Sequence, residues 1–327
     1  MARPVDRALL VHGGALGDFV LSLRIVSALR AAGPARVIVL GRPSVAAVGT
    51  LDGQVDEVFD LDTGGFHTLF HPDAAVSEAV RQRLRPFRRI VNMLPDGSGI
   101  VSRRLAEVAG AEVQPLDPRP REDWPGHVSD QWLADLGAAG LNAEAGPPRI
   151  EVPLGRSAAA ARALELEANQ RRIVLHPGGG SARKCWPVER YLSVAEALSI
   201  QGHSVLWLLG PVEAERWAAR VIAGLRAMGP MIVAPTAVEA AALLASAHGF
   251  VGNDSGPAHL AAAVGIPTVA VFGATHPQRW RPLGENAAAI GGPGDWPEAR
   301  QVVEALDRLT RVSHIRDQAG GVTPAPA

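Results

Sequence analysis

Short apolar runs alternate with longer amphipathic segments along almost the whole chain. Runs rich in Val, Ile and Leu are typical of strands buried on both faces, and the longer Ala/Leu/Arg segments have helical period. The predicted strands are 8–12, 36–41, 57–61 and 89–93 in the first half, and 172–176, 204–210, 231–234, 249–252 and 268–273 in the second. The predicted helices are 18–32, 44–50, 74–84, 98–110, 188–201, 212–228, 238–246 and 258–264.

This alternation predicts an α/β fold with parallel, doubly wound sheets. Because the rhythm occurs twice, we expect two Rossmann-like domains, residues 1–155 and 156–317. A Pro-, Gly- and Asp-rich stretch, 114–148, is expected to be irregular and to separate the halves. The tail 318–327 has no apolar periodicity and is expected to be disordered.

Composition narrows the function classes. The chain has 327 residues, 47% of them hydrophobic, and 32 basic residues against 33 acidic ones, so a packed core is expected and a nucleic-acid-binding surface is not. The single cysteine, Cys185, excludes an internal disulfide and a cysteine-based zinc cluster. No signal peptide or membrane-spanning run is evident, which predicts a cytoplasmic protein.

One basic residue differs from all the others. Lys184 is the only lysine, so the remaining 31 basic residues are arginines. A codon bias towards arginine explains most of this pattern. The single lysine indicates a position that needs a compact ammonium rather than a planar guanidinium, although one lysine can also remain by chance.

The first candidate motif is the segment 13–18 (GGALGD), between the first predicted strand and helix. Gly14 and Gly17 allow a tight turn that brings backbone N–H groups towards a ligand, but the spacing is not that of a dinucleotide fingerprint. Asp18 has two interpretations that position alone does not separate. It either caps the helix or serves as a general base at the carboxyl edge of the sheet.

The second motif is the segment 176–187 (HPGGGSARKCWP), which also follows a strand and precedes a helix. Its glycines let the backbone approach a phosphate, Ser181 offers a hydroxyl and Lys184 a mobile positive charge. The alternative is a flexible loop with an incidental lysine. A Walker P-loop is absent. Trp186 is interpreted as an anchor of the loop and Cys185 as a packing residue.

The third motif, 252–263 (GNDSGPAHLAAA), ends a strand and opens an alanine-rich helix whose N-terminus is suited to an anion. Asp254 is expected to orient this loop or cap the helix, and His259 is either structural or a ligand contact. A carboxylate after the strand 204–210 is a candidate for ribose hydroxyls, with Glu213 and Glu215 both eligible. The pair in 60–62 (DLD) is interpreted as structural rather than as a metal site.

With these motifs in order, residues 8–310 resemble glycosyltransferase family 9, the ADP-heptose:lipopolysaccharide heptosyltransferases. The segment 14–18 resembles the family's amino-terminal signature, and 176–187 its central loop. The segment 254–263, followed by GIP at 265–267 and FGAT at 272–275, resembles its carboxy-terminal signature.

The resemblance implies a GT-B fold, in which two Rossmann-like domains face each other across a cleft, with acceptor on the amino-terminal side and nucleotide sugar on the carboxy-terminal side. A last helix, about 297–309, would pack back towards the first domain. It further implies an inverting heptosyl transfer from ADP-L-glycero-D-manno-heptose without a metal or other cofactor. Asp18 matches the family's catalytic base. The donor-binding positions are matched by Ser181, Lys184, Glu213, Asp254, Ser255, Gly256 and His259.

Two departures bear on the acceptor. The family often has a second basic residue where Cys185 stands, and the amino-terminal half lacks lysines for an anionic lipid-linked or glycan acceptor. Arginines are available there instead, either as acceptor or inner-membrane contacts or as a solvated face: Arg81, Arg83, Arg85, Arg88, Arg89, Arg103 and Arg104. The alternatives are another nucleotide sugar, a sugar-nucleotide epimerase of similar fold, or a non-catalytic nucleotide-binding module.

Overall fold

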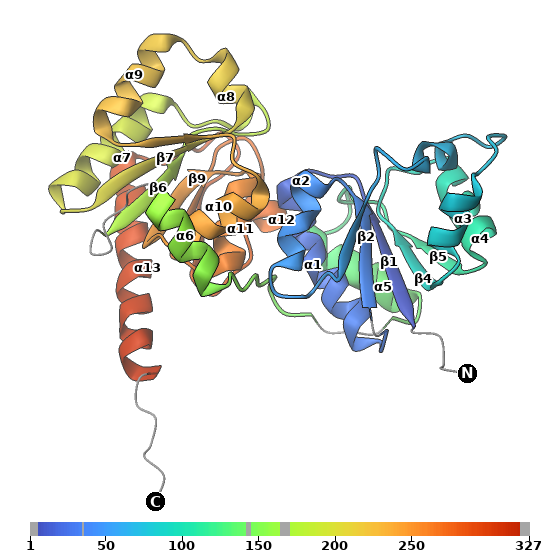
Figure 1. Cartoon of the computed structure of the whole chain (residues 1–327). Coiled ribbons are helices and arrows are strands. Elements are labelled where there is room, and N and C mark those ends of the chain that lie inside the picture. The colour runs from blue at the N-terminus through green and yellow to red at the C-terminus, as the bar shows by residue number, and fades with distance from the viewer. Residues whose placement is uncertain (1–5, 35, 142–144, 164–170, 321–327) are drawn as a thin grey trace, which may run out of the picture. The chain divides into compact units, whose positions relative to one another are not determined.

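The computed structural model describes residues 6–34, 36–141, 145–163 and 171–320. The chain divides into two compact units, Met1–Glu151 and Val152–Ala327, whereas the sequence placed the division between residues 155 and 156. Each unit is a parallel sheet with helices (Figure 1). The predicted α/β class with two Rossmann-like units is confirmed.

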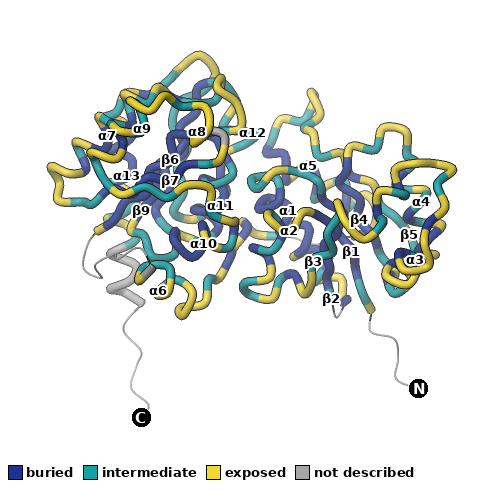
Figure 2. Tube along the Cα trace, turned by 45° about the horizontal axis from the view of Figure 1, so that its top comes forward, coloured by how far each residue is buried: buried dark blue, intermediate teal, exposed yellow. Residues whose placement is uncertain are grey.

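The first unit contains five parallel strands in the order β3-β2-β1-β4-β5. In Figure 2 its central strands are largely buried, which explains their continuous apolar runs. The strands are β1 (Arg7–His12), β2 (Arg36–Gly41), β3 (Glu57–Asp60), β4 (Phe87–Asn92) and β5 (Glu112–Pro115). The helices are α1 (Leu16–Ala31), α2 (Pro43–Ala46), α3 (Glu78–Leu84), α4 (Ile100–Ala109) and α5 (Val128–Ala138), with 3₁₀ turns at Ala47–Thr50 and Phe66–Phe70.

The second unit contains six parallel strands in the order β11-β10-β9-β6-β7-β8. The strands are β6 (Arg172–His176), β7 (Ser204–Leu209), β8 (Met231–Val233), β9 (Gly249–Asn253), β10 (Thr268–Phe272) and β11 (Ala287–Gly291). The helices are α6 (Leu154–Ala163), α7 (Val188–Ile200), α8 (Pro211–Arg216), α9 (Ala219–Met228), α10 (Ala237–Leu244), α11 (Gly256–Val264), α12 (Pro277–Trp280) and α13 (Ala299–Gly320), and a 3₁₀ turn spans Ala182–Lys184.

Several elements differ from those that the sequence pattern predicts, for identifiable reasons. The region expected to be irregular contains α5 and part of β5, a four-residue edge strand that is only half buried and so lacks an apolar run. Strand β11 is also an edge strand, and its sequence AAAIG is mostly alanine, a weak strand former. The helix expected at 212–228 is two helices, α8 and α9, because the chain turns extended at Trp217 and Ala218.

The last helix is longer than its sequence pattern predicts. It packs on α7 and on the strands β9, β10 and β11 of its own unit through Val302 and Leu306. It continues to Gly320, past the expected end at 309 and into the segment expected to be a disordered tail, because no proline or glycine interrupts it earlier. Residues 321–327 lie outside the described part of the chain. No helix within that part has the length and apolar character needed to cross a bilayer.

Candidate functional site

The second unit has its topological switch point between β6 and β9. Strands β7 and β8 follow β6 on one side, and β9, β10 and β11 extend on the other. Parallel strands bring all their carboxyl ends to one edge, and open α/β sheets bind ligands where the strand order reverses. The second and third sequence motifs follow β6 and β9, so the fold brings them together at this point.

Asn253, the last residue of β9, holds the glycine-rich loop in place. Its side chain is fully buried, and its Nδ2 donates to the carbonyls of Pro177 and Gly178, both at 2.9 Å. Its Oδ1 accepts from the Trp186 N–H at 2.9 Å and from the Tyr191 hydroxyl at 3.0 Å. One side chain therefore secures both ends of the loop and satisfies its own buried polar atoms.

Lys184 and Asp254 form the charged centre of the site. The Lys184 Nζ lies 2.8 Å from Asp254 Oδ2, and the same oxygen accepts from the Thr275 hydroxyl at 2.7 Å. The Asp254 side chain is buried, whereas that of Lys184 is 30% exposed. An ammonium has three N–H groups, and one of them is directed at Asp254. The ion pair thus fixes the ammonium at the switch point, and an ammonium that gives one N–H to Asp254 has two further N–H groups to offer an anion.

The side chain of Glu213 binds the backbone of the same glycine-rich loop. It lies in the first turn of α8 and is buried, with Oε2 accepting from the Gly210 N–H at 2.9 Å and Oε1 from the Gly179 N–H at 3.1 Å. A Cβ on Gly178 would lie 2.4 Å from the Glu213 Cδ, so any larger residue there would displace the Glu213 carboxylate. Glu213, rather than the exposed Glu215, therefore joins the β7 loop to the glycine-rich loop.

The other predicted donor residues surround this centre. Ser181 is exposed and precedes the 3₁₀ turn that carries Lys184. Ser255 is the N-cap of α11, its hydroxyl donates to the Asn253 carbonyl at 3.1 Å, and Gly256 begins the helix. His259 is buried within α11. The N-terminus of α11 thus lies beside Lys184–Asp254, where the helix dipole favours an anion.

Burial sets the protonation of two further groups in the loop. His176, at the end of β6, donates from Nδ1 to the Leu208 carbonyl at 2.8 Å, and desolvation lowers its pKa although the Glu213 carboxylate raises it. Burial also raises the pKa of the Cys185 thiol, and its Sγ lies 3.4 Å from the Ser181 carbonyl. Both groups are therefore neutral at pH 7 and contribute packing rather than charge.

The first unit has its own switch point, between β1 and β4, and the first motif follows β1. Asp18 is the third residue of α1, half-buried, and its Oδ2 accepts from the Ala15 N–H at 3.3 Å. Ala15, not Asp18, is the N-cap. A Cβ on Gly14 would come within 3.0 Å of Asp18 Cβ and His12 Cε1, so the turn packs closely on both side chains. Gly17 is the second residue of the helix.

Two basic residues flank this turn. Arg42 donates hydrogen bonds to the carbonyls of Gly13 and Gly14. His12 is buried edge-on against Phe19 at 5.4 Å between ring centroids. Desolvation, with a smaller contribution from the Arg42 charge, lowers the pKa of His12 to about 4. His12 is therefore uncharged at neutral pH, next to a turn that carries the Asp18 carboxyl group and receives the Arg42 guanidinium.

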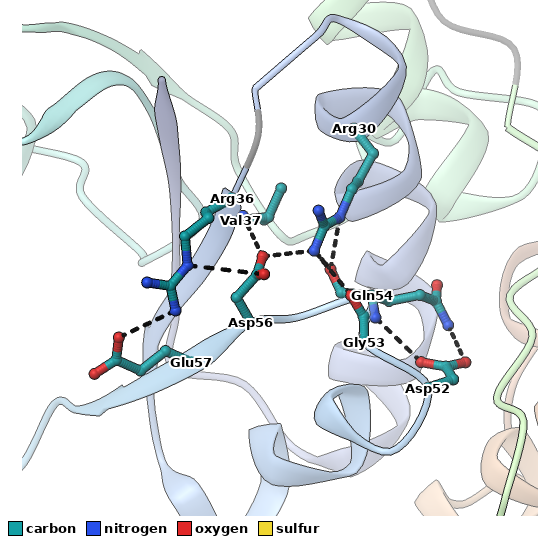
Figure 3. A network of polar contacts seen from close by, with 8 residues as sticks. All are labelled: Arg30, Arg36, Val37, Asp52, Gly53, Gln54, Asp56 and Glu57. Carbon is teal, nitrogen blue, oxygen red and sulfur yellow. Dashed lines mark hydrogen bonds and ion pairs between the residues drawn. The ribbon is translucent and has the colours of Figure 1, made fainter. Parts of the chain in front are cut away.

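Helix α1 is fixed at its opposite end by the network in Figure 3. Arg30 donates to the carbonyls of Gly53 at 2.8 Å and Gln54 at 3.0 Å and pairs with Asp56, whose Oδ2 also accepts from the Val37 N–H at 2.8 Å. These contacts join α1 to β2 and to the segment before β3. They hold the helix whose first turn carries Asp18.

The remaining predictions concern metals and the arginine-rich zone. Asp60 Oδ1 accepts from the Asp62 N–H at 3.0 Å, a local turn, and no group of three possible metal ligands occurs within the described ranges. In the arginine-rich zone, Arg83 lies over the Phe59 ring and Arg85 pairs with Glu78. Arg88 and Arg103 are exposed.

Four residues at the two switch points have no role predicted from the sequence. Asn253 and Thr275 lie inside motifs described above, but their hydrogen-bond partners lie in the connections that follow other strands. Arg42 follows β2 and reaches the β1 loop, and Trp280 ends α12 with its ring 6.0 Å from the Lys184 ammonium. No local pattern marks such residues, because only the sheet order brings them to the loops that they contact.

Comparisons with known proteins agree with this geometry. A family model described as glycosyltransferase family 9 (heptosyltransferase) matches residues 119–307, more than half of the chain. Lipopolysaccharide heptosyltransferase 3 of Escherichia coli is 33% identical over 135 residues, and lipooligosaccharide heptosyltransferase 2 of Haemophilus influenzae is 36% identical over 112 residues. These matches cover 39% and 33% of this chain and 38% and 32% of the relatives, so the chain matches only about a third of their length.

Two solved structures share the fold over nearly the whole chain. The E. coli ADP-heptose lipopolysaccharide heptosyltransferase II has a TM-score of 0.75 at 20% identity, covering 94% of this chain and 99% of that one. A glycosyl transferase family 9 structure from Veillonella parvula has a TM-score of 0.73 at 18% identity, covering 95% and 99%. The fold of these GT-B structures therefore extends to the part of the chain before residue 119, which the family model does not match.

Proposed function

The chain belongs to glycosyltransferase family 9, and on this basis we propose that it transfers a heptosyl group from ADP-L-glycero-D-manno-heptose to an acceptor in lipopolysaccharide core or another surface glycan. The reaction inverts the anomeric centre. The observation that carries the proposal is the pair Lys184–Asp254 at the switch point of the second unit, beside a glycine loop fixed by Asn253.

The chemistry of the proposed transfer follows from charge. The acceptor hydroxyl attacks the anomeric carbon, the bond from that carbon to the β-phosphate oxygen breaks, and ADP leaves with the bonding electrons. Negative charge therefore grows on the diphosphate. A fixed ammonium and a helix N-terminus stabilise it more in the transition state than in the ground state. Lys184 and the start of α11 supply these two groups without a metal ion.

Asp18 is the proposed general base that takes the proton of the acceptor hydroxyl. Its carboxylate is half-buried in the first turn of α1, beside a neutral His12. The N-terminus of a helix favours negative charge, which suits a carboxylate base at this position.

The proposed acceptor is an anionic, lipid-linked or glycan molecule at the cytoplasmic face of the inner membrane. The names of the matched relatives, which are lipopolysaccharide and lipooligosaccharide heptosyltransferases, support this class. The exposed Arg88 and Arg103 are available for its negative charges and for a transient contact with the membrane surface.

The first test is a thermal-shift series with ADP, UDP, GDP, dTDP and NAD, each in large excess. A ligand at 100 times its dissociation constant adds about 2.7 kcal/mol to the stability of the site that binds it. We expect a selective shift with ADP that is lost in Lys184→Ala. A shift with UDP or GDP instead would overturn the donor assignment.

The second test is transfer itself, with ADP-heptose and a lipopolysaccharide core acceptor, in the presence and absence of a metal chelator. We expect inverted product and no effect of the chelator. A heptose isomer formed without acceptor would instead identify a sugar-nucleotide epimerase. Loss of activity on chelation would contradict the role given to Lys184.

A further inference from the structure

Trp280 lies beside the cation of the site although no motif includes it. It ends α12, which follows β10, and its side chain is half-exposed. The Lys184 Nζ lies over the indole ring, 6.0 Å from its centroid. The ring therefore presents a face to the space occupied by the proposed diphosphate-binding ammonium, and it is open to solvent on part of its surface.

The loop that carries Trp280 is fixed to the same centre. Thr275 donates to Asp254 at 2.7 Å, and Asp254 in turn holds Lys184. The backbone N–H of Trp280 donates to the His276 carbonyl at 3.2 Å, a helical hydrogen bond that closes α12. At the start of the loop, Gly273 packs so closely on Trp296 that an added Cβ would lie 2.0 Å from its ring. The β10 loop thus holds the backbone that carries Trp280 next to Asp254 and Lys184.

The order of strands gives the site a direction. Glu213 follows β7, Lys184 follows β6, Asp254 follows β9 and Trp280 follows β10, and these strands are neighbours in that order. Three strand spacings separate β7 from β10, about 14 Å. A nucleotide sugar with its diphosphate at Lys184–Asp254 and its nucleoside towards Glu213 therefore extends its sugar towards Trp280.

We propose that the indole of Trp280 forms the floor of the sugar subsite and packs against the apolar C–H face of the glycosyl group. This inference rests on the proposed function. Aromatic faces bind the apolar faces of ligands, and a polar rim then fixes their orientation. The contact belongs to the donor and is absent from the ADP product. Trp280 is thus a specificity-determining residue that distinguishes the nucleotide sugar from its leaving group.

The test measures dissociation constants for ADP and for ADP-heptose by titration calorimetry, in wild type, Trp280→Ala and Trp280→Phe. We expect Trp280→Ala to weaken ADP-heptose about tenfold and ADP less than about twofold, because an aromatic contact accounts for roughly one power of ten. Trp280→Phe keeps a ring and falls between the two. Trp124→Ala is the matched control, since Trp124 is also half-exposed beside a cation, Arg121, but in the first unit.

The outcomes separate this inference from the proposed function. If wild type binds neither ligand, the proposed donor is wrong. If wild type binds both and Trp280→Ala weakens them equally, the ring acts on the nucleoside or through Lys184, and the sugar subsite is refuted. An unchanged ratio of the two constants in Trp280→Ala refutes it as well.

A spectroscopic readout checks the same contact without any substitution to alanine. Binding of ADP-heptose, but not of ADP, should change tryptophan emission in wild type and in Trp124→Phe. The sugar-dependent change should disappear in Trp280→Phe. A change that persists in Trp280→Phe would assign the sugar to a different part of the site.

Discussion

The candidate sites of the two units share a strand end and a glycine turn but differ in where their acidic residue comes from. In each, a strand at the switch point ends in a buried histidine, His12 or His176, and a glycine turn follows. In each, an acid in the first turn of a helix accepts a hydrogen bond from the backbone. Asp18, however, belongs to the helix that directly follows its own turn, whereas Glu213 comes from the next β–α connection.

This difference in environment suits the two acids to different roles. Asp18 is half-buried and accepts the Ala15 N–H at 3.3 Å, a long hydrogen bond. Glu213 is buried and accepts two backbone N–H groups at 2.9 and 3.1 Å, which commits both oxygens to holding loops together. A carboxylate in the first situation is suited to proton transfer, and one in the second to positioning. The ribose contact expected of Glu213 stays a prediction.

The largest effect should come from removing the proposed base. We expect Asp18→Asn to lower the rate of transfer by about 10²–10⁴, because the amide keeps the shape and one acceptor but takes no proton. The melting temperature and ADP affinity should change little. Asp60→Asn, at an acid of the same unit that stabilises only a local turn, is the control for kinetics and folding. Full activity in Asp18→Asn would leave the first unit without a base.

Glu213→Gln tests the positioning role of the acid in the second unit. A carboxamide has one acceptor oxygen for two N–H donors, so one buried bond is lost and its donor is left facing an NH₂ group. We expect a loss of about 1–3 kcal/mol in stability together with weaker ADP binding, measured by urea denaturation and calorimetry. A variant that is as stable as wild type but slower in turnover would instead make Glu213 a catalytic group.

The buried histidine of the first unit should make stability depend on pH. The pKa of His12 is lowered from 6.5 to about 4 in the folded chain, so the unfolded chain binds more protons between these values. Stability is therefore complete above pH 6.5 and falls with pH below it, by about 2 kcal/mol at pH 5. Urea denaturation at pH 6.5 and at pH 5 should show that the free energy of unfolding depends less on pH in His12→Gln than in wild type. The exposed His67→Gln should behave as wild type.

Glycine substitutions compare the two turns directly. We expect Gly178→Ala to cost about 1–3 kcal/mol, because its Cβ would lie 2.4 Å from the buried Glu213 Cδ. Gly14→Ala should cost less, since its nearest contacts are at 3.0 Å. Gly180→Ala, with nothing within 4 Å, is the control in the same loop. Equal melting temperatures for all three would show that the β6 loop is not held as described.

The smallest expected effect concerns Arg42. Its charge lowers the pKa of His12, but desolvation is the larger cause. Arg42→Gln should therefore raise the His12 pKa by less than about one unit, as followed by NMR of the ring protons. It should also loosen the turn, because Arg42 donates to the Gly13 and Gly14 carbonyls. A larger rise would mean that charge rather than burial controls this histidine.

Much of the fold follows from local pattern. The central strands β1, β2, β6, β7, β9 and β10 are continuous apolar runs, and they were predicted to within about two residues. The edge strands β5 and β11 were missed because a half-buried strand needs no such run. The helix α5 was missed because prolines, glycines and aspartates around it indicated a loop.

The sequence by itself determined the two parallel sheets, the positions of three glycine-containing loops and the identity of the charged residues in them. It did so because strand period, glycine turns and a solitary lysine are local properties. Only the tertiary structure decided that Asp254 binds Lys184, that Asn253 secures the glycine loop, that Glu213 joins β7 to β6, and that Trp280 faces the ammonium. Each of these contacts joins different strand connections, and the order in which strands pair brings them to one edge.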